Sequence, residues 1–149
     1  MNGIILTSAT KGVVFSVLLV CAVISCDTDT PLTEYIPTSD QEAALKNILL
    51  DFQDGVNRRD AAKLAGLIHE DATLTVGRNR QGISKAEYVK VLPRRLKDNP
   101  PIALGKPKMM LAGNTADVSI YMTRGDARFL FTFHLKHVDR HWSITGWTY

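Results

Sequence analysis

The spacing of hydrophobic residues along the chain changes near residue 100, from a helical period to strict alternation. Before that point, apolar residues recur at intervals of three and four, as at Leu45, Leu49 and Phe52. Each of the three helices that this pattern predicts begins at a residue able to cap it, namely Ser39, Asp60 and Ser84. A short strand is predicted at 72–76, followed by a polar turn at 77–82.

After residue 100, hydrophobic and polar residues alternate through four segments separated by turn residues, which predicts antiparallel strands. These strands cover residues 102–111, 116–123, 128–137 and 142–149. Helices followed by a meander of strands indicate an α+β fold, with the helices packed on one face of the sheet. The face expected to contact the helices carries Val118, Ile120, Met122, Phe129, Phe131, Phe133, Leu135, Trp142 and Ile144.

The opposite face of the predicted sheet is half apolar, although it would be turned away from the helices. Its large apolar residues, together with one histidine, are Tyr121, Leu130, His134, Trp147 and Tyr149. Aromatic residues are enriched at protein interfaces, so we predict that this face forms an isologous homodimer. The alternative is a solvated face whose residues reflect strand propensity alone.

An apolar run at residues 13–24 follows a single basic residue, Lys11, near the N-terminus. Its 12 residues are too few to span a bilayer, which takes about 20, but they fit the hydrophobic region of a secretory signal peptide. The run ends at Ser25 and Cys26, and this junction resembles a bacterial lipobox. The resemblance implies cleavage after Ser25 and a lipid on Cys26. Otherwise the segment is an ordinary signal peptide or an uncleaved anchor.

The predicted organisation is a signal peptide at 1–25, a flexible tether at 26–39 and a folded domain at 40–149. The tether is predicted because the stretch contains prolines, threonines and acidic residues without an apolar period. We therefore expect a protein that is lipid-anchored to a membrane of the bacterial cell envelope and faces the periplasm or the exterior.

The composition argues against nucleic acid, metal ions and nucleotide cofactors as ligands. The 18 basic and 15 acidic residues are interspersed, so no binding to nucleic acid is expected. Both cysteines, Cys21 and Cys26, lie in the N-terminal segment, which excludes a cysteine-based zinc site in the domain. The histidines do not have a consistent metal-ligand spacing, and no glycine-rich phosphate loop follows a strand. We expect neither a metal nor another cofactor.

Five short motifs follow one another in a recognisable order. They are VNRRD at 56–60, LIHEDA at 67–72, GISKAEY at 82–88, AGNTADV at 112–118 and DRHWSI at 139–144. Together they resemble the nuclear transport factor 2-like (NTF2-like) superfamily, and in particular its SnoaL-like bacterial branch. The resemblance implies a cystatin-like, cone-shaped α+β barrel. In that fold a curved antiparallel sheet wraps around three N-terminal helices, encloses a pocket and commonly forms a dimer.

The residues predicted to line this pocket are Tyr88, Met122, Phe131, Phe133 and Trp142. No acid or base interrupts the inward positions of the last three strands, although proton transfer in an apolar pocket needs one. We therefore favour a non-enzymatic module that binds a small apolar ligand or a protein partner. The alternative is a small lyase or isomerase with acid–base groups at the pocket mouth. Its candidate residues are His69, Tyr88, His137 and Asp54.

Overall fold

The computed structural model describes residues 30–77 and 81–149, and the predicted α+β class is confirmed. Its helices are η2 (Leu32–Glu34, a 3₁₀ turn), α1 (Asp40–Asn57), α2 (Ala61–Leu67) and α3 (Lys85–Asp98). Its strands are β1 (Thr73–Val76), β2 (Gln81–Ser84), β3 (Ile102–Ala112), β4 (Thr115–Arg124), β5 (Ala127–Val138) and β6 (His141–Thr148). The predicted signal peptide and Cys26 lie outside the described residues.

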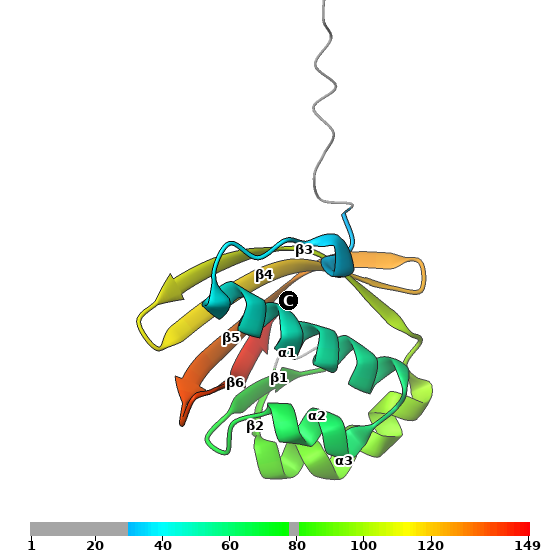
Figure 1. Ribbon diagram of the computed structural model, residues 1–149. Helices are drawn as coiled ribbons and strands as arrows, with labels where there is room; N and C mark the ends of the chain where they lie inside the picture. Colours follow the sequence, from blue (N-terminus) through cyan, green and yellow to red (C-terminus); the bar gives the residue numbers. More distant parts are fainter. Residues whose placement is uncertain (1–29, 78–80) are drawn as a thin grey trace, which may run out of the picture.

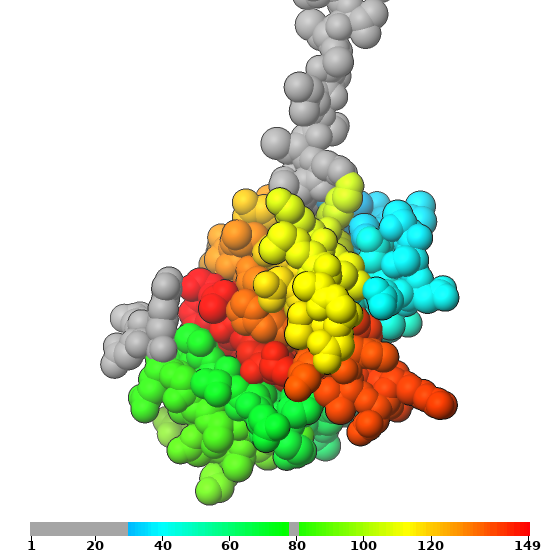
Figure 2. Space-filling view, turned by 90° about the vertical axis from the view of Figure 1, so that its left-hand side faces the viewer, coloured from blue at the N-terminus to red at the C-terminus, as the bar shows by residue number. Residues whose placement is uncertain are grey.

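Strands β3 to β6 form one antiparallel sheet in sequence order, and it curves around α1 (Figure 1). The shorter helices α2 and α3 lie beside the small β1–β2 sheet, away from β3 and β4 (Figure 1). Figure 2 shows β6, in red, between the green segment that contains the small sheet and the yellow-to-orange strands of the large one. Within the part of the chain that the structure describes, no helix is both long and apolar enough to cross a bilayer.

The predicted caps position the three helices. The Ser39 hydroxyl accepts a hydrogen bond from the backbone N–H of Glu42, and the Asp60 carboxylate accepts one from that of Lys63. At α3 the capping box is complete, because the side chain of Glu87 also accepts the backbone N–H of Ser84. These bonds satisfy donors that the first turn of a helix otherwise leaves unpaired.

Part of the predicted polar turn at 77–82 belongs instead to a strand. Residues Gln81–Ser84 form β2, which pairs with β1 in antiparallel register. The sequence QGIS has no apolar alternation that would indicate a strand. It is extended because its backbone pairs with β1, and its C-terminal end leads directly into α3.

The prediction of a flexible tether over 26–39 is wrong for residues 30–39. Pro31 forms an antiparallel bridge with Gly105 of β3, and the Leu32 side chain is only 1% exposed within the core. The ammonium group of Lys46 donates hydrogen bonds to the carbonyls of Thr33 and Tyr35, at 3.0 and 2.6 Å. Residues 30–39 therefore belong to the folded domain.

The β5–β6 pairing contains a β-bulge that reverses the predicted orientation of the chain end. Leu135 pairs with Ile144 but its neighbour His134 pairs with Gly146, so Thr145 is an extra residue in β6. Beyond the bulge, Trp147 lies on the same face as Phe133 and is only 6% exposed. The expectation that Trp147 and Tyr149 lie on the outer face is therefore wrong. A glycine is needed at 146, since a Cβ atom there would lie 2.9 Å from the carbonyl oxygen of Thr73.

Leu32→Ala is expected to lower the free energy of unfolding by about 2–5 kcal/mol, because it opens a cavity under β3. Ile36→Ala is the matched control in the same segment. Its side chain is 82% exposed, so a change within about 0.5 kcal/mol is expected. Chemical denaturation of the full chain, followed by circular dichroism, measures both. Equal effects of the two variants would show that the segment is not part of the cooperative fold.

Candidate functional site

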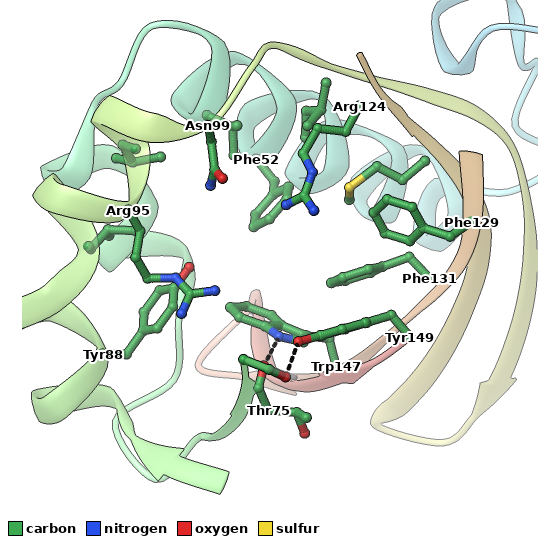
Figure 3. A pocket seen from close by; sticks show the side chains of 16 residues that line it. Phe52, Thr75, Tyr88, Arg95, Asn99, Arg124, Phe129, Phe131, Trp147 and Tyr149 are labelled. Atoms are coloured by element: carbon green, nitrogen blue, oxygen red, sulfur yellow. Dashed lines mark hydrogen bonds between the residues drawn. The ribbon is translucent and has the colours of Figure 1, made fainter. Parts of the chain in front are cut away.

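A cavity of about 350 Å³ lies between α1, α3 and the helix-facing side of the large sheet, and it is partly open to solvent (Figure 3). Its large apolar side chains are Phe52, Leu92, Leu96, Ile102, Met122, Phe129, Phe131 and Trp147. Polar groups are contributed by Thr75, Tyr88, Arg95, Asn99, Arg124 and Tyr149. An apolar concave site with a few polar groups is the usual form of a small-molecule site.

The aromatic side of the cavity is fixed by ring packing and by two hydrogen bonds to the small sheet. The Trp147 ring centroid lies 5.3 Å from that of Tyr88 and 6.0 Å from that of Phe131. Its indole N–H donates to the carbonyl of Thr75 at 2.8 Å, and the Tyr149 hydroxyl donates to the carbonyl of Gly77 at 3.1 Å (Figure 3). The Tyr149 ring stacks on Phe131 at 5.7 Å. This side of the cavity is therefore held in one arrangement.

Tyr88 supplies a protonated hydroxyl to the cavity. Its side chain projects from α3 and is buried, and this burial raises its pKa to about 12, although the nearby Arg95 acts in the opposite direction. At neutral pH the hydroxyl is a hydrogen-bond donor and acceptor, not a base.

Three of the five predicted pocket residues, Tyr88, Met122 and Phe131, line this cavity. The other two do not. Phe133 is fully buried in the core. Trp142 lines a separate hollow at the other end of β6, where its ring lies 5.2 Å from that of His137. The bulge explains why Trp147 lines the cavity in place of Trp142. The extra residue Thr145 shifts the alternation of β6, so that the Trp147 side chain points inward.

The remaining acid–base candidates lie away from the cavity. His69 follows α2, where its Nδ1 accepts the backbone N–H of Asp71 at 3.2 Å. His137 lies in the separate hollow with Trp142. Asp54 forms surface ion pairs with Arg58 and Lys63, and its pKa is lowered mainly by the hydrogen bond from Lys63. These groups therefore do not combine with Tyr88 into one catalytic constellation.

Three of the five predicted interface residues lie on the outer face of the large sheet. Tyr121 and Leu130 are exposed, and His134 lies 2.7 Å from the carboxylate of Asp117 on the neighbouring strand. The Arg128 guanidinium covers the Tyr121 ring at 4.6 Å. Without Trp147 and Tyr149 this face is less aromatic than predicted. Its role in a homodimer stays a prediction.

Two arginines of the cavity were not predicted from the sequence. Arg95 projects from the last turn of α3 and Arg124 from the end of β4, and Figure 3 shows both guanidinium groups directed toward the centre of the cavity. Arg124 also lies over the Phe129 ring, at 5.6 Å. Within residues 30–77 and 81–149, no carboxylate forms an ion pair with either guanidinium. The predicted strand ends at residue 123, which places Arg124 in the following turn, although alternation continued from Met122 would place it on the helix-facing side.

Among the described residues of the cavity, no side chain carries a carboxylate or an imidazole. The same described part of the chain contains no group of three or more histidine, cysteine or acidic side chains arranged to hold a metal ion. The chemistry available in the cavity is therefore apolar contact, hydrogen bonding and positive charge.

No model of a known protein family matches the sequence, and no curated protein matches it. Many solved structures share the fold. An NTF2-like protein of Cytophaga hutchinsonii has a TM-score of 0.65 and 14% identity, over 73% of this chain and 96% of that one. A cystatin-like protein of unknown function from Nostoc punctiforme has a TM-score of 0.64 and 10% identity, over 76% and 92%. A protein assigned provisionally as a ketosteroid isomerase, from Shewanella frigidimarina, has a TM-score of 0.61 and 16% identity, over 70% and 94%. The chain therefore has the NTF2-like, cystatin-like fold that its motifs predicted.

The raised pKa of Tyr88 predicts a loss of stability at high pH. Since the pKa is about 12 in the folded chain and 10.0 for an unperturbed tyrosine, this stabilisation is complete below about pH 10 and is lost as the pH rises toward 12, by up to about 3 kcal/mol. At about pH 11, Tyr88→Phe should leave the tyrosinate absorbance of the folded protein unchanged, because Tyr88 is still protonated there. Loss of one tyrosinate signal in the variant would contradict this assignment.

Proposed function

We propose that this NTF2-like domain binds a small, largely apolar molecule in the cavity beside Trp147 and catalyses no reaction on it. We further propose that a lipid on Cys26 holds the domain at a membrane of the bacterial cell envelope. The observation that supports binding most directly is the cavity itself, with its aromatic side and its volume of about 350 Å³. Sites for small ligands typically measure about 300–1,000 Å³.

The polar groups of the cavity favour binding over acid–base catalysis. A general base works best with a pKa near the working pH. The pKa of Tyr88 is instead raised away from neutral pH, to about 12, and no described side chain of the cavity is a carboxylate or an imidazole. The provisional isomerase assignment of one structural neighbour does not transfer, because shared fold alone does not determine function.

Binding can be tested with N-phenyl-1-naphthylamine, a neutral apolar molecule whose fluorescence rises in apolar surroundings. We expect saturable 1:1 binding to the full chain. Val56→Phe, on the α1 side of the cavity, should weaken binding about tenfold or more by filling the space that the probe occupies. Val91→Phe is the matched control, since Val91 is an exposed residue of α3 outside the cavity. No binding, or equal loss in both variants, would contradict the proposal.

A lipid on Cys26 would change the mass of the mature protein and its location in the cell. In a bacterial host the mature protein should begin at Cys26 and carry acyl chains, so that it fractionates with membranes and is extracted by detergent. Cys26→Ser should leave an unprocessed or unacylated chain, whereas Cys21→Ser should be processed as the natural protein is. Intact-mass spectrometry of the membrane fraction distinguishes these products. An unmodified Cys26 in the natural protein would exclude the anchor.

A further inference from the structure

We propose that the ligand of this cavity is an apolar carboxylic acid, whose carboxylate is bound between Arg95 and Arg124. The inference rests on the proposed binding function and adds the chemical class of the ligand. It starts from the two guanidinium groups, which reach the cavity from α3 and from the end of β4 and are both directed toward its centre (Figure 3).

The positive charges of the cavity favour an anionic ligand. An arginine side chain stays charged at all physiological pH values, so the pair brings two positive charges to a largely apolar site. Arg95 is half-buried and Arg124 is exposed at the edge of the cavity, and within the described residues neither has a carboxylate partner. An anionic group of a bound molecule would form charge-assisted hydrogen bonds with these guanidinium groups.

Local explanations account for one arginine at a time but not for the pair. Arg95 lies in the last turn of α3, where a cation is favoured by the helix dipole. Lys97 lies in the same turn and Arg94 directly before it, and both side chains are exposed outside the cavity. The dipole therefore does not require the inward direction of Arg95. Arg124 gains a contact with the Phe129 ring, but that contact leaves its charge without a counter-ion.

The other polar groups suit a carboxylate head. Figure 3 shows Asn99 beside the two arginines and the Tyr88 hydroxyl near the Arg95 guanidinium. An amide N–H and a phenolic O–H both donate hydrogen bonds, and a carboxylate accepts up to about four. The rings of Phe131 and Trp147 would then contact an apolar body, since they lie on the opposite side of the cavity from Asn99 (Figure 3). The occupant that fits is a monoanion with a compact aromatic or branched apolar part.

The test compares two probes that share one ring system, 2-naphthoic acid and 2-naphthalenemethanol, by calorimetric titration of the full chain. We expect the acid to bind at least about tenfold more tightly than the alcohol, and higher salt to weaken only the acid. Arg95→Gln and Arg124→Gln should each weaken the acid about tenfold and leave the alcohol unchanged. Arg94→Gln, which removes an equal charge outside the cavity, should change neither.

The outcomes separate the two proposals. If both probes bind equally, or if Arg94→Gln weakens the acid as much as the cavity variants do, the assignment of an acidic ligand is overturned while the binding function stands. If neither probe binds and N-phenyl-1-naphthylamine also fails to bind, the binding function itself is overturned. Binding of the acid alone supports both.

Discussion

The indole of Trp147 connects the large sheet to α1, to α3 and to the small sheet. Its ring contacts Phe52 of α1 and Tyr88 of α3, and its N–H donates to the carbonyl of Thr75 in β1. A buried donor without an acceptor would cost about 1–3 kcal/mol, so the ring and β1 hold each other in place. This arrangement depends on the extra residue Thr145, without which Trp147 would lie on the outer face of β6. One side of the cavity thus exists because of a single irregularity in strand pairing.

The features predicted from sequence are those whose physical cause is local. Ser39, Asp60 and Ser84 cap the helices that were predicted from them, because a cap acts only on the first turn after it. Alternation likewise placed Met122 and Phe131 on the helix-facing side, since neighbouring side chains of a regular strand must point in opposite directions. The fold follows from these two kinds of signal.

The features that sequence did not reveal depend on contacts between distant segments. The alternation of apolar and polar residues does not reveal the bulge at Thr145, because alternation assumes a regular strand. The bulge lies next to Gly146, whose backbone passes close to the carbonyl of Thr73 in β1, a contact between segments far apart in the sequence. The two cavity arginines likewise meet through strand pairing, because Arg124 pairs with Ile102, which follows the end of α3 after a short connection. The aromatic half of the site was therefore partly predicted, whereas its charged half was overlooked, although Arg124 continues the alternation of β4.

Pro31 pairs with β3 only five residues after Cys26, which limits where an anchored domain could travel. Five residues span at most about 18 Å when fully extended. A lipid on Cys26 would thus hold Pro31, and with it the β3 side of the molecule, within about 18 Å of the anchored cysteine. The domain would then pivot at the membrane surface instead of ranging through the surrounding compartment.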